Sequence, residues 1–175
     1  MTDRNPGGGT APLYLDDLRV GQRFVSGTYR LDEEQIRAFA AQFDPQPFHL
    51  DAEAAQGTLF GGLVASGWHT AAVTMRLLVE GGLPIAGGII GAGGKITWPN
   101  PTRPGDVLQV ESEILELRPS RSGPNRGVVT VRSETRDQPA KLSRCSSPSS
   151  SCRVQQGSPA QNPRLLVSPA AGDFT

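Results

Sequence analysis

The sequence is poor in cysteine, in net charge and in long apolar runs, and each shortage excludes a class of function. Lys and Arg together number 17, as do Asp and Glu, so no net field attracts nucleic acid or an anionic membrane. No apolar run approaches the roughly 20 residues that a bilayer-spanning helix requires. The two cysteines, Cys145 and Cys152, lie in a Ser-rich segment without histidine neighbours. Neither a zinc site nor a disulfide framework is therefore indicated.

The N-terminal segment also lacks the apolar core of a signal peptide. Residues 1–12 are rich in Gly and Pro and include the charged Asp3 and Arg4, so we predict a disordered tail there. A chain of 175 residues most simply forms one domain with flexible ends. We expect a cytoplasmic protein whose domain spans residues 13–138, followed by an atypical Ser/Pro-rich tail over residues 139–175.

Two helices are predicted in the first half of the chain. Asp32 followed by Gln35 forms a capping box, and apolar residues then recur at helical spacing as far as Phe43. Ser66 is a suitable N-cap for a second helix, from Gly67 to Glu80, which is apolar on nearly every side. A helix with that pattern is expected to lie inside the domain.

Strand patterns occur on both sides of these helices. β-branched and aromatic residues predict a strand over residues 22–30, and alternating runs predict further strands at about 89–98, 107–117 and 127–136. Turns rich in Pro and Gly separate the last three runs. One buried helix with a succession of antiparallel strands makes an α+β domain, in which the sheet wraps around the central apolar helix.

A carboxylate and an imidazole lie close together in the sequence between the two helices. Asp44 and His49 are five residues apart, and Pro45 and Pro47 between them restrict the backbone and remove two hydrogen-bond donors. We expect a stiff loop that presents both side chains, a pair suited to proton transfer near neutral pH. Gly67, eighteen residues after His49, begins the central helix, where its free N–H could stabilise a developing negative charge.

This order of residues carries a family resemblance. Asp-x-x-Pro-x-His, followed after eighteen residues by a Gly at the head of an Ala-rich helix, resembles the MaoC-like family of (R)-specific enoyl-CoA hydratases. The similarity extends from about Tyr14 to Gln138 and includes Trp-Pro-Asn-Pro-Thr-Arg-Pro-Gly-Asp at residues 98–106. The resemblance implies the hot-dog fold, an acyl-CoA or acyl-carrier thioester as substrate, and a homodimer or larger homo-oligomer with its active site near the subunit interface.

The resemblance also implies roles for individual residues. Asp44 and His49 would be catalytic: together they would hold a water molecule that adds across the double bond of a trans-2-enoyl thioester. The backbone N–H of Gly67 would bind the thioester oxygen. No metal or redox cofactor is implied, since the CoA thioester is the substrate. The substrate pocket is expected to include Gln46, Phe48, Phe60, Ser66 and Trp68.

Each of these assignments has a plainer alternative. Asp44 precedes a proline and can simply start a turn, His49 can be a buried packing residue, and Gly67 can permit close packing of the helix start. Trp68 and Trp98 are both suited to a core or an interface. Two other functions also stay open, namely an acyl-thioester hydrolase on the same fold and a non-catalytic acyl-binding subunit.

Two positions depart from the family pattern, and two other residues have open roles. Gln46 stands where many family members have Asn, and Ser66 stands where hydratases of this type often have His. His69, the second histidine, is expected to be structural or pocket-lining. Arg103 lies in a Pro-rich turn, where it could meet a CoA phosphate or simply be solvated.

The pattern changes abruptly after Gln138. Ser, Pro and Gln replace the alternating pattern where the family has another apolar strand. A run of serine codons TCN read two bases later becomes a run of NTC, which encodes Phe, Leu, Ile or Val, so residues 139–154 are compatible with a frameshifted final strand. The alternative is an ordinary low-complexity tail, which would leave the sheet without a strand or with a poor substitute. We favour the shifted frame, because such a domain should not leave its central helix half covered.

Overall fold

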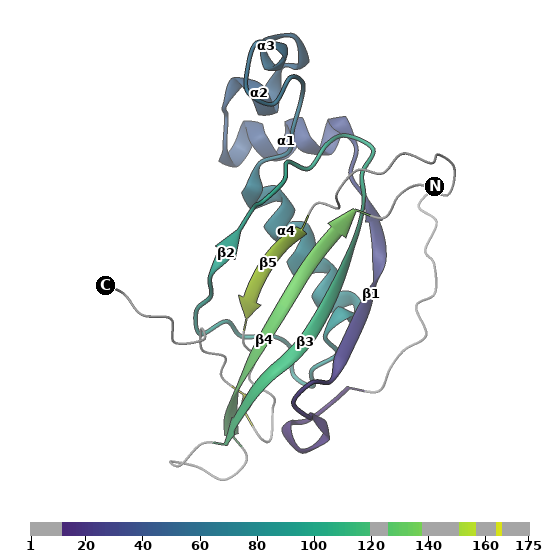
Figure 1. The fold of residues 1–175 in the computed structure, drawn as a ribbon, viewed down its shortest axis with the longest axis vertical. Helices are drawn as coiled ribbons and strands as arrows, with labels where there is room; N and C mark the ends of the chain where they lie inside the picture. Colours follow the sequence, from purple (N-terminus) through teal and green to yellow (C-terminus); the bar gives the residue numbers. More distant parts are fainter. Residues whose placement is uncertain (1–11, 120–125, 138–150, 157–163, 166–175) are drawn as a thin grey trace.

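A six-stranded sheet packs against one central helix, and three further helices lie together at one end (Figure 1). The structure is a computed structural model that describes residues 12–119, 126–137, 151–156 and 164–165. The strands are β1 (Arg23–Arg30), β2 (Ile96–Thr97), β3 (Val107–Pro119), β4 (Arg126–Asp137), β5 (Ser151–Gln156) and β6 (Arg164–Leu165). Their order is β1-β3-β4-β5-β2, all antiparallel, while β6 pairs with β4 in parallel. The predicted α+β class, a central helix against an antiparallel sheet, is confirmed.

Strands β3 and β4 form the longest pairing in the sheet, from Leu108↔Asp137 to Pro119↔Gly127. Alternate residues of β3 face the central helix and are buried, as the period of two in a strand requires. The buried set on β3 is Leu108, Val110, Ser112 and Ile114. Both strands begin and end within two residues of the predicted ranges.

The central helix, α4 (Gly67–Leu77), begins where predicted but ends earlier. Ser66 is its N-cap and accepts the N–H of Trp68 at 3.2 Å. The α-helix gives way to a π-type turn, η2 (Leu78–Gly82), in which the N–H of Leu83 bonds the carbonyl of Leu78. Gly81 adopts a φ of 138° there, a conformation that favours glycine and unwinds the last predicted helical turn.

Hydroxyl pairs run along the interface between α4 and the elements that cover it. Thr74 lies 2.6 Å from Thr135 of β4, measured between the Oγ1 atoms, and Thr70 donates to Thr102 at 3.1 Å. All four residues are buried. Each hydroxyl has a hydrogen-bond partner, so the desolvation cost of burying it is offset.

The helices at the end of the sheet are α1 (Glu33–Phe43), α2 (Pro47–Leu50) and α3 (Ala52–Gln56). The predicted capping box of α1 is present, because Asp32 accepts the N–H of Gln35 at 2.8 Å and the Gln35 side chain accepts the N–H of Asp32 at 3.0 Å. The stiff loop expected after Asp44 is instead mostly helical. Pro47 occupies the first position of α2, where its missing N–H costs no hydrogen bond.

The strand predicted at about residues 89–98 was wrong in extent, since β2 comprises only Ile96–Thr97. Gly93 interrupts the predicted range with a positive φ of 150°, while Gly87 and Gly88, whose φ values are 80° and 89°, lie just before it. β2 pairs with β5, which is contributed by the Ser-rich tail and lies between β4 and β2. Most of the frameshift hypothesis concerns residues 139–150, outside the described residues, so it stays a prediction.

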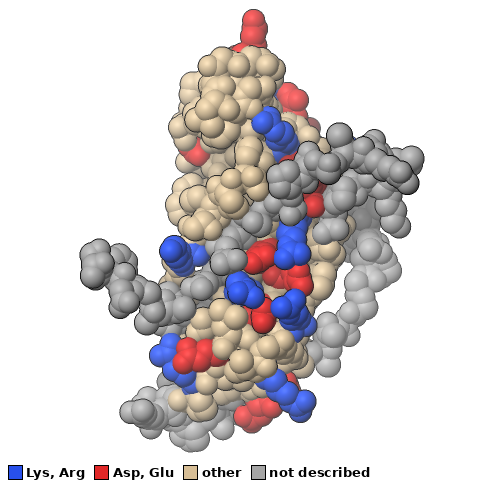
Figure 2. Space-filling view, in the orientation of Figure 1, with Lys and Arg blue, Asp and Glu red and all other residues tan. Residues whose placement is uncertain are grey.

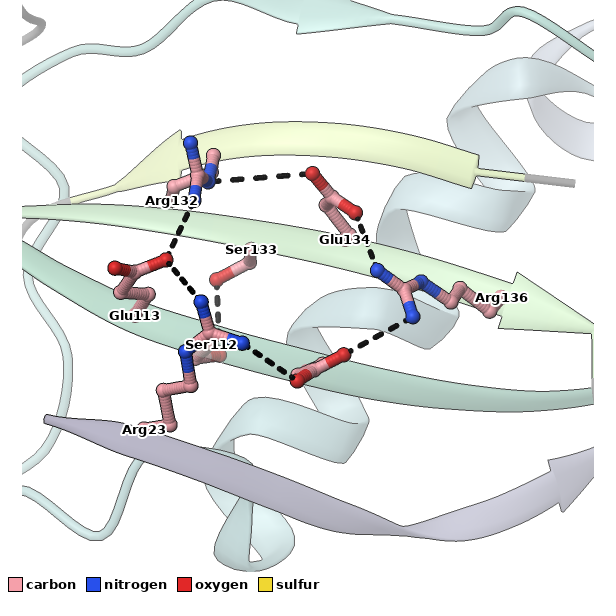
Figure 3. A network of polar contacts seen from close by, with 8 residues as sticks. Arg23, Ser112, Glu113, Arg132, Ser133, Glu134 and Arg136 are labelled. Carbon is pink, nitrogen blue, oxygen red and sulfur yellow. Dashed lines mark hydrogen bonds and ion pairs between the residues drawn. The ribbon is translucent and has the colours of Figure 1, made fainter. Parts of the chain in front are cut away.

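The outer face of the sheet carries a ring of alternating charges, formed by Arg23, Glu111, Arg136, Glu134, Arg132 and Glu113 (Figure 3). We call these six residues the charge ring. Neighbouring members lie 2.5–3.9 Å apart between nitrogen and oxygen, and each arginine contacts two glutamates. On the face that Figure 2 shows, residues of both signs are mixed over the strands, whereas most of the end formed by α1–α3 is tan, with a few charged residues at its border. Within the described ranges, no helix is both long and apolar enough to cross a membrane.

Candidate active site

Asp44 and His49 meet at the junction of α1 and α2. The Oδ2 atom of Asp44 lies 3.3 Å from Nε2 of His49, and both side chains are largely buried. Asp44 is the C-cap of α1, with φ −154° and ψ 68°, which turns the chain away from the helix. His49 follows on α2, so the two residues predicted to act together are brought together.

The other nitrogen of His49 determines which tautomer the ring adopts. Nδ1 lies 2.7 Å from the carbonyl oxygen of Val64, which can only accept a hydrogen bond. Nδ1 therefore carries a hydrogen, and in the neutral ring Nε2 has only a lone pair. Because Nε2 faces a carboxylate, the two groups attract each other only through a shared proton or a bridging water. The pair is thus built to hold a mobile proton or a water molecule.

Two neutral side chains donate hydrogen bonds to the Asp44 carboxylate. Ser66 Oγ donates to Oδ2 at 2.6 Å, and Gln46 Nε2 donates to Oδ1 at 2.8 Å. The hydrogen bond from Ser66 is the main reason that the pKa of Asp44 is lowered, with Gln46 and the charge of His49 adding to it and desolvation opposing it. Asp44 is accordingly an ionised carboxylate at neutral pH.

Ser66 has two roles that sequence reasoning did not connect. It caps α4, as predicted, and its hydroxyl also donates to Asp44, 22 residues away. The start of the central helix is therefore tied to the carboxylate. A serine just before a helix signals the cap, but nothing local in the sequence indicates the second bond.

Gly67 is the first residue of α4, and its N–H has no acceptor within the helix. The ring of Trp98 covers the place where a side chain would begin: a Cβ at Gly67 would lie 2.8 Å from Trp98 Cε2. The plainer interpretation of Gly67, close packing of the helix start, therefore holds. It is compatible with an anion-binding N–H, which stays a prediction.

A groove of about 590 Å³ joins these groups, and Asp44, His49 and Gly67 all line it. Four of the five predicted pocket residues, Gln46, Phe48, Phe60 and Trp68, also line it. Ser66, the fifth, is buried and acts through Asp44. Sequence reasoning did not assign Thr70 and Thr102 to the groove, although both line it.

The two tryptophans do not belong to a core. Trp68 is 59% exposed and Trp98 is 42% exposed, and their rings meet edge to face with centroids 5.4 Å apart. Both line the groove, so of the two predicted alternatives the core was wrong, and the interface stays a prediction. Leu59, 91% exposed, extends the apolar border of the same groove. The acid–base pair thus opens to solvent between aromatic and aliphatic side chains.

Comparison with known proteins shows the family to which the chain belongs. The family model described as "MaoC like domain" matches residues 18–137. The chain belongs to the MaoC-like family. The crystal structure of a MaoC-like dehydratase from Rhodospirillum rubrum is 56% identical, with a TM-score of 0.71 over 82% of this chain and 96% of that one.

Two further relatives extend the comparison. The uncharacterized protein YdeM of Bacillus subtilis is 35% identical over 72% of this chain and 89% of its own length. The unliganded R-hydratase PhaJ1 from Pseudomonas aeruginosa is 28% identical, with a TM-score of 0.64 over 83% of this chain and 84% of that one. These likenesses confirm the hot-dog fold that the motif implied and place the chain among MaoC-like dehydratases and hydratases.

The second histidine, His69, lies outside the groove of this MaoC-like site. Its ring stacks on Phe39 of α1, with centroids 4.5 Å apart and planes 2° from parallel. Burial lowers the pKa of His69, although the charge of Asp32 opposes the shift. His69 therefore has a packing role. Among the described residues, no group of three His, Cys, Asp or Glu side chains could hold a metal ion.

Proposed function

We propose that the protein is an (R)-specific hydratase/dehydratase that adds water reversibly to a trans-2-enoyl thioester and forms an (R)-3-hydroxyacyl thioester. The observation that supports this most directly is that Asp44, His49 and Gly67 line one groove. These three groups provide a carboxylate that can accept a proton, an imidazole that can orient water and relay a proton, and an N–H for a developing oxyanion. Membership of the MaoC-like family and the likeness to an R-hydratase support the same reaction class.

In the hydration direction, one water molecule would bind between Asp44 and His49. The Asp44 carboxylate accepts a proton from this water as the water oxygen attacks C3 of the enoyl group. His49 orients the water, and the proton that Asp44 has accepted is then delivered to C2 with the assistance of His49, so that H and OH of one water molecule both end on the substrate and Asp44 is again a carboxylate. The bond from Nδ1 to the Val64 carbonyl supports this role, because it keeps Nε2 directed toward the water and Asp44.

The thioester oxygen would bind the N–H of Gly67. As water adds at C3, negative charge develops on this oxygen, and the positive end of the α4 dipole stabilises it. A single donor of this kind contributes roughly 3 kcal/mol in comparable oxyanion sites. The ring of Trp98, packed on Gly67, would exclude solvent from one side of the thioester.

We also propose that the working form is a homodimer or larger homo-oligomer. Leu59, Trp68 and Trp98 are exposed around the groove, and large apolar side chains gathered in one place are typical of a surface that another chain covers. Light scattering coupled to size-exclusion chromatography would measure the mass directly. A mass equal to 18.6 kDa would reject this part of the proposal.

Incubation with crotonyl-CoA tests the reaction itself. A hydratase removes the absorbance of the conjugated enoyl thioester without releasing free thiol. Release of thiol would instead identify a thioesterase, and the absence of both changes would support a non-catalytic acyl-binding subunit. Chiral analysis of the 3-hydroxybutyryl product would then test the (R) configuration.

A further inference from the structure

Arg103 is held in a defined position at the groove. Its Nη2 donates to the carbonyl of Phe60 at 2.7 Å, and Gly62 lies beneath it, where a Cβ would come within 3.6 Å of Nη1. Its backbone N–H donates to the Asp106 carboxylate at 2.7 Å. The preceding residue is tied to the site as well, because the Thr102 carbonyl accepts the N–H of Ala65 at 2.8 Å. The guanidinium is therefore anchored to the segment that leads into α4.

The Arg103 guanidinium forms no ion pair with the described residues, although its charge acts on the nearby Asp106 carboxylate and opposes the rise in the Asp106 pKa that burial causes. No carboxylate of the described residues lies within 4.0 Å of its guanidinium, whereas each arginine of the charge ring contacts two. Asp106, the nearest acid in sequence, binds the backbone of Arg103 instead. Arg103 is also the one Lys or Arg among the described residues that line the groove. The Phe60 carbonyl uses one of its five N–H donors, which leaves donors for a ligand.

We propose that Arg103 binds a phosphate group of the carrier that delivers the acyl thioester, so that this site selects phosphate-bearing carriers over simple thioesters. This inference rests on the proposed function, because it takes the groove to be the thioester site. A planar guanidinium fixed at one edge presents parallel donors to a phosphate, which it binds more strongly than a mobile ammonium does. The rest of the lining contains no other Lys or Arg, so this arginine supplies the groove's attraction for anions.

Three substrates with the same acyl group test the proposal: crotonyl-CoA, crotonyl-4′-phosphopantetheine and crotonyl-pantetheine. In Arg103→Gln, we expect KM for crotonyl-CoA to rise roughly tenfold with little change in kcat, because a charge-assisted contact to the carrier is lost. KM for crotonyl-pantetheine, which has no phosphate, is expected to stay the same. Arg103→Lys keeps the charge without the planar fork, so its KM for crotonyl-CoA should lie between those of the wild type and Arg103→Gln.

The phosphopantetheine substrate identifies which phosphate is bound. If its KM also rises in Arg103→Gln, the 4′-phosphate shared by CoA and carrier proteins is the ligand. If only crotonyl-CoA is affected, the ligand is a phosphate of the nucleotide part. Arg19→Gln is the matched control, because Arg19 is exposed and does not line the groove, and it should leave all three KM values unchanged.

Two results would overturn the proposal. An equal loss with all three substrates would mean that Arg103 only supports the local structure, and unchanged kinetics with crotonyl-CoA would mean that it binds no phosphate. Calorimetric binding of crotonyl-CoA and crotonyl-pantetheine separates this inference from the proposed function. If the protein hydrates neither, the reaction is wrong, yet weaker binding of crotonyl-CoA alone by Arg103→Gln would still establish the phosphate contact.

Discussion

Charged side chains have different kinds of partner in the charge ring and in the groove. In the ring, acid and base alternate, and every arginine contacts two glutamates across β1, β3 and β4 (Figure 3). In the groove, Asp44 is held by the neutral groups of Ser66 and Gln46, and Arg103 is held by a backbone carbonyl. Neutral partners fix a charged group in place without cancelling its charge. The charged groups of the groove therefore stay available to a ligand, whereas those of the charge ring pair with one another.

The largest expected effect comes from removing the charge of Asp44. Asp44→Asn keeps the size of the side chain but cannot accept a proton from water, so kcat for crotonyl-CoA hydration should fall by roughly 100-fold or more. Asp16→Asn, at an exposed position outside the groove, is the matched control and should behave as the wild type. If Asp44→Asn kept the kcat of the wild type, the proposed catalytic role of the Asp44 carboxylate would be wrong.

Gly67 tests how tightly the groove is packed. In Gly67→Ala the added Cβ would lie 2.8 Å from the Trp98 ring, so we expect the free energy of unfolding to fall by roughly 1–3 kcal/mol. Gly91→Ala is the matched control, because a Cβ there meets nothing within 4 Å. Urea denaturation measures both changes. Equal stability of the two variants would show that Trp98 moves aside at little cost.

Ser66→Ala removes a neutral donor from Asp44 and so tests what holds its charge. The Ser66 hydrogen bond lowers the pKa of Asp44, and without it the pKa rises. Because the ionised carboxylate is the active form, the acidic limb of the kcat/KM profile should move to higher pH. At neutral pH, kcat/KM should fall roughly tenfold, which corresponds to the loss of one charge-assisted hydrogen bond.

Ser66→Thr serves as the control for that variant, since it retains a hydroxyl at the same position. Its acidic limb should stay close to that of the wild type. The alanine variant also loses the N-cap of α4, at a cost of about 1 kcal/mol in stability. A fall in activity with no movement of the acidic limb would mean that the cap alone matters.

Sequence reasoning predicted interactions between residues that are close in the sequence and missed those between distant segments. The capping box of Asp32 and Gln35 and the N-cap at Ser66 are local, and both were correctly predicted. The Ser66–Asp44 bond and the packing of Trp98 on Gly67 join distant segments, so no local pattern reveals them. The family motif identified Asp44, His49 and Gly67 because it records residues that folding brings together.

The errors also have local causes. The segment before β2 has apolar residues that favour a strand, but its glycines with positive φ override that tendency. Pro47 was taken as a loop residue, although the first position of a helix suits it equally well. Both cases involve residue types whose preferences allow two structures, and tertiary contacts decide between them.

The smallest effect is expected in the charge ring, where Glu113 contacts both Arg23 and Arg132. Glu113→Gln should lower the free energy of unfolding by roughly 0.5–1 kcal/mol, because pairs at a solvated surface gain little over hydration and are weakened by salt. The loss should shrink further when urea denaturation is repeated in high salt, and kcat/KM for crotonyl-CoA should stay unchanged. A large change in activity would mean that the ring is coupled to the groove through β3 and β4, and the contrast between a structural and a ligand-binding use of charge would then fail.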